Sequence, residues 1–371
     1  MRIVHLCSSL AGGGAERQLC YLASELGARG HRVDVVVVNS GQNLALLAAA
    51  ENVRIHILGE GKPVHHGKRS WANYNPGILG RVIALLRRLR PDVVQTWIMQ
   101  MDVIGGIAAA MSQVPWVLRE PVSALMYSSG GLRVAVRTLL ARTAAAVVAN
   151  SAAGSEYWQA VQPSAPRVVI RNGVPLKEID RVSRLSSSEI TNEMPLILYA
   201  GRFHDQKNVE RTLKAIVQAA SQCEGQGILC GAGPLRSRLA EMLEQLPGSS
   251  RVKLWDYQTQ LWPLMKRADV FLSASHYEGC PNAVMEAMAC RCPLVVSNIQ
   301  EHHELLSADS AEFVDHQSVD SISQGILRVL ENRKLSEARV ATAYSRIRHF
   351  SVEEMTGRYE DLYKAVCRNT Q

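Results

Sequence analysis

The chain has 371 residues, of which 47% are hydrophobic and 20% charged, a composition typical of a globular protein with sizeable cores. This length predicts two domains. No apolar run reaches the ~18 residues that span a bilayer, and the apolar patch near the N-terminus is too short for a signal peptide. We therefore expect a cytoplasmic protein whose eight cysteines are reduced thiols.

Positive charge is concentrated in the first half of the chain. Residues 1–175 hold 18 Lys and Arg against 9 Asp and Glu, a net of +9, whereas the remainder holds 23 against 25, a net of −2. Such asymmetry suggests an acidic partner, namely nucleic acid, anionic lipid or a phosphorylated acceptor, or else serves solubility alone. Nucleic acid is disfavoured because aromatic residues make up only 5% of the chain and are not interleaved with the basic ones.

Short apolar runs alternate with helical patterns through the first half. Strands are expected at 2–6, 32–38, 53–58, 92–97, 116–120, 145–151 and 167–174, and helices at 15–29, 77–90, 102–112, 131–143 and 152–161. This alternation builds βαβ units and a mostly parallel sheet that is buried on both faces.

A polar, serine-rich stretch at 181–195 is typical of a linker, and the alternation restarts after it. Strands are expected at 196–201, 227–233 with its loop, 251–257, 269–275 and 293–298, and helices at 208–222, 235–245, 259–267, 318–332, 335–349 and 351–366. The predicted fold class is α/β, with two doubly wound, Rossmann-like domains that face each other across a ligand crevice at the carboxyl ends of their strands.

Two glutamates bracket the start of a helix in HYEGCPNAVMEAMACRCPLVV, residues 276–296. The helix is expected to begin near Pro281 and Asn282, because proline suits the first helical position. Free N–H groups at such a helix start form a phosphate site. Glu286, about one turn farther in, would accept hydrogen bonds from ribose hydroxyls, and Glu278 would hold a second set of hydroxyls.

A second strand supplies positive charge at the same edge of the sheet. In AGRFHDQKN (200–208), Arg202 would hold a diphosphate by its planar fork and Lys207 by its point charge. Asn208 is expected to cap the next helix. The glycine turn of GAGPLRSRL (231–239) would carry a nucleotide base.

GRFHDQKN, GAGPLRSRLAEML and SHYEGCPNAVMEAMACRCPLVVSN, in that order, resemble the donor domain of the retaining glycosyltransferases of family 4, which have the GT-B fold. GGGAERQLCYLASELGARGHRV resembles the family's glycine loop and first helix, and VVANS followed by VVIRNGV its pre-linker pattern. The final helix resembles one that crosses back to the first domain. The resemblance implies an acceptor-binding domain of 1–175 plus 351–371 and a donor-binding domain of 176–350.

The resemblance implies transfer of a sugar from a nucleotide sugar with retained anomeric configuration, without a metal or other cofactor. Arg202, Lys207 and Glu278 would form the catalytic set, the first two stabilising the charge of the leaving diphosphate. The implied donor-site residues are Gly201, Arg202, Lys207, Gly231, Gly233, Pro234, Leu235, Glu278, Gly279, Cys280, Pro281, Asn282, Ala283 and Glu286, and the phosphate and acceptor loop is Gly12, Gly13 and Gly14.

The chain departs from the family pattern at a few positions. Family members often carry a histidine after a strand like 116–120, where this chain has Arg119 and Glu120, which we expect on the acceptor side. Position 291 is often glycine, which fits a helix end at positive φ, so Arg291 should cost about 1 kcal/mol there. Cys280 stands where a bulkier apolar residue is common.

Other motifs have a structural and a functional interpretation. Cys290 and Cys292 lack a second pair, so they do not predict a zinc site. The basic helices at 78–90 and 131–142 either pack on the sheet with solvated arginines or form a monotopic membrane surface. His65 and His66 lie in a basic loop that would contact an acceptor or headgroup.

We therefore predict a hexosyltransferase on the inner face of the plasma membrane, associated peripherally with its anionic surface. The donor would supply a hexose or N-acetylhexosamine, from a UDP-sugar first and from GDP-mannose second. The acceptor would be a growing, lipid-linked glycan such as a precursor of capsule or lipopolysaccharide. Two alternatives remain: a nucleotide-sugar 2-epimerase on the same fold, and a non-catalytic partner that binds a sugar nucleotide or glycan.

Overall fold

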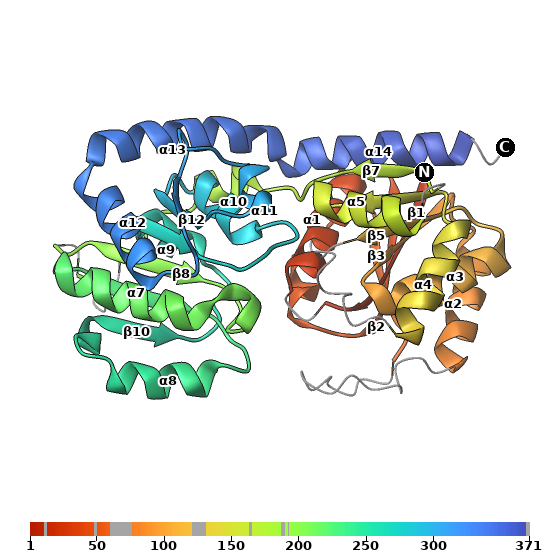
Figure 1. Ribbon diagram of the computed structural model, residues 1–371. Helices are drawn as coiled ribbons and strands as arrows, with labels where there is room; N and C mark the ends of the chain where they lie inside the picture. Colours follow the sequence, from red (N-terminus) through yellow and green to blue (C-terminus); the bar gives the residue numbers. More distant parts are fainter. Residues whose placement is uncertain are drawn as a thin grey trace. The chain divides into compact units, whose positions relative to one another are not determined.

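The computed structural model describes residues 1–10, 13–47, 50–59, 76–120, 131–162, 165–186, 190–191 and 193–368, which divide into two compact units (Figure 1). The first unit comprises Met1–Gly173 with Val352–Gln371, and the second comprises Val174–Ser351. The sequence prediction placed the two boundaries after residues 175 and 350.

A seven-stranded parallel sheet forms the first unit, in the order β3-β2-β1-β4-β5-β6-β7. Its strands are β1 Arg2–Ser9, β2 Arg32–Asn39, β3 Val53–Ile57, β4 Val93–Trp97, β5 Trp116–Glu120, β6 Ala146–Ala149 and β7 Arg167–Val169. Its helices are α1 Gly14–Ala28, α2 Pro76–Leu89, α3 Met99–Ser112, α4 Leu132–Leu140, α5 Ala152–Val161 and α14 Val352–Arg368, with the short 3-10 helices η1 Gln42–Leu46 and η4 Ala141–Thr143.

Helices cover both faces of this sheet. Ile3 and Cys7 of β1 belong to one buried cluster, with residues of α1 and α14. Val4 and Leu6 of the same strand belong to another, with residues of α2 and α3. Because side chains of a strand alternate between its faces, the two clusters are the two sides of one doubly wound sheet, as the sequence predicted.

The final helix, α14, packs on the first unit, which confirms the predicted return of the chain. Tyr359 and Tyr363 on α14 are fully buried. The Tyr363 hydroxyl donates to Gln95 Oε1 of β4 at 2.6 Å, and Arg119 Nε of β5 donates to the Tyr359 hydroxyl at 2.9 Å. Two strands are thereby tied to a helix that follows them by more than two hundred residues.

A six-stranded parallel sheet forms the second unit, in the order β10-β9-β8-β11-β12-β13. Its strands are β8 Leu196–Ala200, β9 Gln226–Cys230, β10 Val252–Trp255, β11 Val270–Ser273, β12 Leu294–Ser297 and β13 Glu312–Val314. Its helices are α6 Leu176–Arg181, α7 Val209–Gln222, α8 Arg236–Gln245, α9 Trp262–Arg267, α10 Asn282–Ala289, α11 Gln300–His303, α12 Val319–Glu331 and α13 Arg333–Ile347, with η5 Asp205–Lys207, η6 Ser249–Arg251 and η7 Arg348–Phe350.

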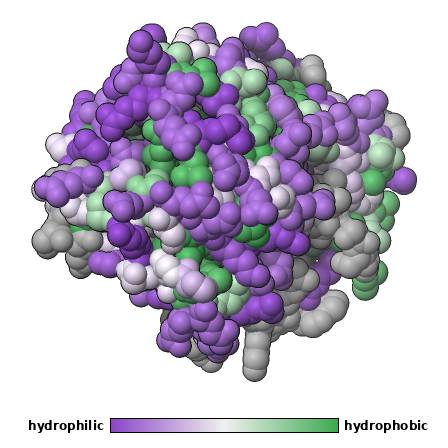
Figure 2. All heavy atoms as spheres, turned by 60° about the vertical axis from the view of Figure 1, so that its left-hand side comes forward, coloured by the Kyte–Doolittle hydropathy of each residue, from purple (hydrophilic) through white to green (hydrophobic). Residues whose placement is uncertain are grey.

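The second sheet is also covered on both faces. Leu196 and Leu198 of β8 pack in the cluster that includes α9, α10 and α13, and Ile197 and Tyr199 pack in the cluster that includes α7 and α12. Figure 2 shows one face of the molecule, on which hydrophilic side chains predominate and hydrophobic residues form small separate patches. The apolar residues of the strands therefore lie in the two layers between the sheet and the helices.

Most predicted elements are present within a few residues of their expected bounds. Besides short 3-10 helices, three short elements were missed. The missed elements are α6, α11 and β13. Arg291 has φ 56°, which confirms the predicted positive φ at the end of α10, and its guanidinium lies 4.0 Å from the ring centre of Tyr344. This stacking offsets part of the backbone cost.

Glycines allow the loops at the carboxyl edge of the second sheet to lie against one another. A Cβ on Gly231 would clash with the carbonyl oxygen of Gly201, and one on Gly233, whose φ is 157°, would clash with that of Phe203. Backbone hydrogen bonds join the same loops, from Phe203 N to Ala232 O and from Gly231 N to Trp255 O. The position of the loop that carries Arg202 therefore depends on bare backbone in the neighbouring loop.

Gly231→Ala should lower the melting temperature of the protein, because the added methyl overlaps backbone that cannot rotate away. We expect a loss of about 1–3 kcal/mol, as for other overpacked sites. Gly80→Ala is the matched control, since nothing lies within 4 Å of its would-be Cβ. It replaces a glycine inside α2 and should raise stability by about 0.5–1 kcal/mol. Equal melting temperatures for the two variants would contradict the packing argument.

Candidate functional site

Polar side chains gather where two neighbouring strands of the second sheet end. β8 pairs with β11, with Val270 opposite Ile197, so the segments that follow these strands meet at one edge. The first segment carries Arg202 and Lys207, and the second carries Glu278. The structure thus brings together the three residues that the sequence singled out as a catalytic set.

Glu278 and Lys207 form an ion pair in which the carboxylate is buried and the lysine is partly exposed. The Lys207 ammonium donates to both carboxylate oxygens of Glu278, at 2.6 and 2.7 Å, and the Ser275 hydroxyl donates to Oε1 at 2.6 Å. Glu278 is 4% exposed. Burial acts to raise its pKa, but the charge and hydrogen bonds of Lys207, with Ser275, outweigh burial, so the pKa of Glu278 is lowered from its usual value.

Backbone and amide contacts fix the two partners of this pair. The Glu278 backbone N–H donates to Glu301 Oε1 of α11 at 3.2 Å. Asn208, next to Lys207, donates through Nδ2 to the carbonyls of Ala274 and His316, at 3.0 and 2.7 Å. Asn208 occupies the N-cap position of α7, as predicted, but its side chain makes no capping bond and its backbone has φ 51°.

Arg202 differs from Lys207 because its side chain is exposed. Its Nη2 donates to Gln206 Oε1 at 3.2 Å, and Gln206 Nε2 donates to the Tyr277 carbonyl at 3.0 Å. The loop after β8 is thereby joined to the loop after β11 a second time. The Arg202 guanidinium therefore lies at the same edge of the sheet as the ion pair and is exposed to solvent.

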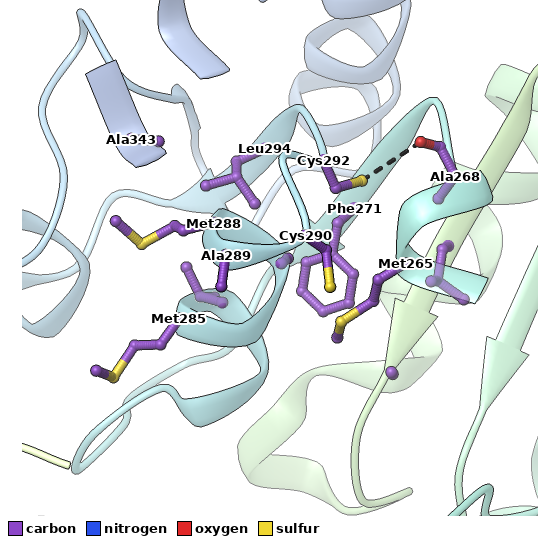
Figure 3. Close-up of a cluster of buried hydrophobic side chains, with 14 of the residues drawn as sticks. Met265, Ala268, Phe271, Met285, Met288, Ala289, Cys290, Cys292, Leu294 and Ala343 are labelled. Atoms are coloured by element: carbon purple, nitrogen blue, oxygen red, sulfur yellow. Dashed lines mark hydrogen bonds between the residues drawn. The ribbon is translucent and has the colours of Figure 1, made fainter. Parts of the chain in front are cut away.

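Helix α10 begins at the same edge, at Asn282, within the predicted start. Pro281 precedes its first residue, Asn282, and Gly279, Cys280, Asn282 and Ala283 are half-buried. Behind this start the helix is fixed by apolar packing: Met285, Met288 and Ala289 lie in the cluster drawn in Figure 3, with Met265, Phe271, Leu294 and Ala343. The first N–H groups of α10 have no partner within the helix, so its start can receive an anion.

Glu286 lies four residues into α10 and is held by a tryptophan that sequence analysis missed. Trp262 Nε1 of α9 donates to Glu286 Oε2 at 2.9 Å, and Glu286 is 5% exposed. The indole N–H donates a single hydrogen bond to Oε2, and a carboxylate can accept more than one. No spacing in the sequence connects residues 262 and 286.

A pocket of about 640 Å³ lies beside α9, at the carboxyl end of β10. It is lined by Leu185, Leu254, Trp255, Asp256, Gln258, Gln260, Pro263 and Leu264. The sequence predicted that the turn at 231–239 carries the nucleotide base instead. In that turn Gly233 and Pro234 are exposed and Leu235 is half-buried, and Arg236 Nε, at the start of α8, donates to Asp256 Oδ1 at 3.3 Å.

The structure contradicts the expectation that Arg119 and Glu120 contact an acceptor. Both side chains are about 1% exposed, at the end of β5. Arg119 donates to Asn172 and Tyr359, and its guanidinium lies 4.3 Å from the ring centre of Trp97. These are contacts of the interior of the first unit, so the two residues position strands and helices.

Glu120 takes part in a buried cluster of charges. Arg137 of α4 donates to Asp102 Oδ2 at 2.7 Å and to Glu120 Oε2 at 2.8 Å, and Trp158 Nε1 donates to Glu120 Oε2 at 3.1 Å. Thr96 donates to Asp102 Oδ1 at 2.6 Å. Burial raises the pKa of Asp102 to about 6, although Arg137 and Thr96 act in the opposite direction.

The other predicted residues are placed as follows. Gly13 precedes α1 and Gly14 opens it, and the Glu16 carboxylate lies against Gly13, at the helix start where a phosphate would bind. Gly12, His65 and His66 lie outside the described residues. Cys290 and Cys292 are buried, and burial raises the pKa of Cys290 to about 12. Among the described residues, no group of His, Cys, Asp or Glu is arranged to hold a metal ion.

Two family models match almost all of the chain between them. The model described as "Glycosyl transferases group 1" matches residues 184–346, which contain the ion pair and α10. The model described as "Glycosyltransferase Family 4" matches residues 12–178. The chain belongs to glycosyltransferase family 4. As a family 4 enzyme it is a glycosyltransferase, and the resemblance seen in its motifs is confirmed.

Curated relatives of this glycosyltransferase include mannosyltransferases. It is 25% identical over 362 residues to the GDP-mannose-dependent alpha-(1-6)-phosphatidylinositol dimannoside mannosyltransferase of Mycobacterium tuberculosis, covering 92% of this chain and 91% of that protein. It is 24% identical over 168 residues to the UDP-Gal:alpha-D-GlcNAc-diphosphoundecaprenol alpha-1,3-galactosyltransferase of Escherichia coli, covering 44% of this chain and 43% of that one.

Solved structures share the fold at low sequence identity. HepE of Anabaena, in complex with UDP and glucose, matches with a TM-score of 0.82 at 20% identity, over 98% of this chain and 99% of that chain. The sucrose-phosphate synthase of Thermosynechococcus elongatus matches with a TM-score of 0.83 at 18% identity, over 100% of both chains. The family 4 enzyme therefore has the predicted GT-B fold.

Lys207→Met should destabilise the glycosyltransferase, because it leaves the buried Glu278 carboxylate without a cation. We expect a loss on the order of 2–4 kcal/mol near pH 8. The loss of stability should be smaller near pH 5. Without Lys207, burial raises the pKa of Glu278, so the carboxyl takes up a proton more readily, and a protonated carboxyl costs less to bury. Melting temperatures at several pH values measure both effects.

The double variant Lys207→Met with Glu278→Gln is the control for this ion pair. Removing both charges should restore a good part of the stability lost in Lys207→Met, because no unpaired carboxylate remains. A double variant as unstable as the sum of its two single variants would show that the pair contributes nothing through charge.

Asp102→Asn should change how stability depends on pH. In the folded protein Asp102 takes up a proton below a pKa of about 6, whereas the unfolded chain does so near 3.8. Its contribution to stability is therefore complete below about pH 4 and is lost as the pH rises through 6, on the order of 2–3 kcal/mol in total. Between pH 6 and 4 the wild type should gain melting temperature relative to Asp102→Asn, and exposed Asp361→Asn should show no such trend.

Proposed function

We propose that the enzyme is a retaining, metal-independent hexosyltransferase that uses a nucleotide-diphosphate sugar and extends a lipid-linked glycan. The observation that carries this proposal is the ion pair of Lys207 and Glu278 at a sheet edge shared with exposed Arg202 and the start of α10. This set offers two cations and a helix start to a diphosphate, and a carboxylate to the sugar beside it.

The cations would act on the leaving group. As the bond between the sugar and the diphosphate breaks, negative charge builds on the phosphate oxygens. Arg202 would hold these oxygens by two parallel N–H bonds and Lys207 by its ammonium, which stabilises the developing charge. In this proposal the two side chains and the N–H groups of α10 supply all of the counter-charge.

Glu278 would exchange partners when the donor binds. The ammonium of Lys207 would turn to the diphosphate, and the oxygens that it leaves on Glu278 would accept hydroxyl groups of the donor sugar. Ser275 and the backbone contact to Glu301 keep the carboxylate in place during this exchange. Glu278 would orient the sugar at the reacting centre, an effect that accelerates the transfer by fixing its geometry.

The nucleoside would lie between Glu286 and the pocket at β10. Glu286, held by Trp262, would accept the ribose hydroxyls, and the pocket would take the base. We keep UDP-sugar as the first donor and GDP-mannose as the second. The UDP-sugar is supported by the relative named for UDP-Gal. The GDP-mannose alternative is supported by the GDP-mannose-dependent relative and by the Asp256 carboxylate in the pocket lining, which can accept from two guanine N–H groups.

A lipid-linked acceptor is supported by the relatives and by charge. The galactosyltransferase of Escherichia coli is named for an acceptor on diphosphoundecaprenol, and the mannosyltransferase of Mycobacterium tuberculosis for one on phosphatidylinositol. The basic excess of residues 1–175 suits an anionic acceptor or membrane surface. None of the described helices is long and apolar enough to cross a bilayer. We propose peripheral attachment at the inner face of the plasma membrane, for capsule or lipopolysaccharide precursors.

Thermal shifts with UDP, GDP and their sugars, with and without EDTA, test the donor site. A ligand at about 100 times its dissociation constant adds roughly 2.7 kcal/mol of stability. We expect a shift with one diphosphate series that EDTA leaves unchanged. Arg202→Ala, at an exposed position, should fold normally and lose most of the shift, whereas Arg328→Ala, a half-exposed arginine elsewhere on the second unit, should keep it.

The pattern of shifts separates the alternatives. A GDP shift that Asp256→Asn weakens, with no UDP shift, would select guanosine. If no nucleotide changes the melting temperature of a well-folded sample, the assignment of the donor site is wrong. Release of nucleotide that requires an acceptor would exclude the 2-epimerase, and loss of release with retained folding in Glu278→Ala would exclude the non-catalytic partner.

A further inference from the structure

Helix α4 of the first unit exposes two leucines to solvent and buries an arginine that lies between them in the sequence. Leu132 is 72% exposed and Leu139 is 60% exposed, whereas Arg137 between them is 1% exposed. Ala135 is exposed on the same face. A surface helix normally places its apolar stripe toward the core and its charges in water.

The buried charge cluster explains why the helix stays in this orientation. Arg137 is bound by the carboxylates of Asp102 on α3 and Glu120 on β5. Rotating α4 to bury its leucines would pull Arg137 away and leave two buried carboxylates without a cation, which costs at least as much as exposing two leucines. The leucines are thus held outward by an interaction on the opposite side of the helix.

The exposed charges of the helices α2, α3, α4 and η4 are all positive. In α2, α3, α4 and η4, the only acidic residue is Asp102, which is fully buried on Arg137. Exposed arginines of the same elements are Arg81, Arg87, Arg88 and Arg142. Contacts of α3 with both α2 and α4 make these helices one layer, and Figure 1 shows them side by side.

We propose that α4 docks on an anionic phospholipid bilayer, with Leu132, Ala135 and Leu139 inserted at the headgroup boundary. Leucines in the acyl region with arginines at the phosphates are the usual pattern of a helix that lies in the interface. The exposed leucines would be stabilised by an apolar environment. The exposed arginines, with no exposed acid in the same helices, would bind the phosphates of the lipid headgroups. The biological purpose, reach to a lipid-linked acceptor, rests on the proposed function, but the docking itself needs no substrate.

Co-sedimentation of the full-length protein with vesicles tests the proposal. The probes are vesicles of phosphatidylcholine alone and of phosphatidylcholine with phosphatidylglycerol, at low and physiological salt. We expect binding to the anionic vesicles, weaker at higher salt because exposed charges are screened. Leu132→Ser with Leu139→Ser should lower the partition coefficient about tenfold or more, because two apolar side chains lose their insertion.

A leucine of similar kind on the second unit provides the matched control. Leu335 of α13 is 44% exposed, and Leu335→Ser should bind vesicles like the wild type. Melting temperatures should match for all variants, because the changes lie on the surface.

Failure of the wild type to bind anionic vesicles would overturn the proposal, as would an equal effect of the α4 and α13 variants. Equal binding to neutral and anionic vesicles would overturn the role of the arginines. These outcomes are independent of nucleotide binding, so a failed donor assignment would be recognised separately.

Discussion

Burying both faces of a parallel sheet leaves one kind of place for polar chemistry, the loops at the carboxyl ends of its strands. Both units obey this constraint, because helices cover each sheet on both sides. In the second unit the loops after β8, β9 and β10 are joined by backbone bonds, which demands glycine at 231 and 233. The cationic loop is therefore positioned by main chain that cannot vary, while its side chains remain free to specify a ligand.

Charge buried at these loop ends has a different outcome in each unit. In the second unit a lysine and a glutamate neutralise each other where a ligand can reach the lysine, which is 20% exposed. In the first unit one arginine serves two carboxylates that are fully enclosed, and burial raises the pKa of one of them. The first arrangement can exchange partners with an anion. The second arrangement is closed to solvent. It fixes which side of α4 faces the core.

The fold and the core of the donor site were predictable because their signals are local. Buried strands appear in the sequence as apolar runs. Pro281 indicates the start of a helix, and Glu278 and Glu286 lie on either side of that start. β13, α6 and α11 were missed because three to six residues carry too little periodicity. Trp262 and the pocket at β10 were missed because their relation to Glu286 is purely tertiary.

The wrong predictions concern charged residues whose partners lie far along the chain. Arg119 and Glu120 stand at the end of a strand of the first sheet, and Arg202 follows a strand of the second sheet. The partners of Arg119 and Glu120 on α14 and α4 nevertheless enclose them. No local pattern in the sequence distinguishes the two cases.

The basic helices α2 and α4 look alike in sequence but are oriented differently in the structure. In α2 the apolar stripe packs inward at Val82, Leu85 and Leu86, with arginines in solvent, as one interpretation held. In α4 the arginine is inside. Two acids, from α3 and β5, hold Arg137 inside, so the exposure of Leu132 and Leu139 follows from these ion pairs rather than from hydrophobicity.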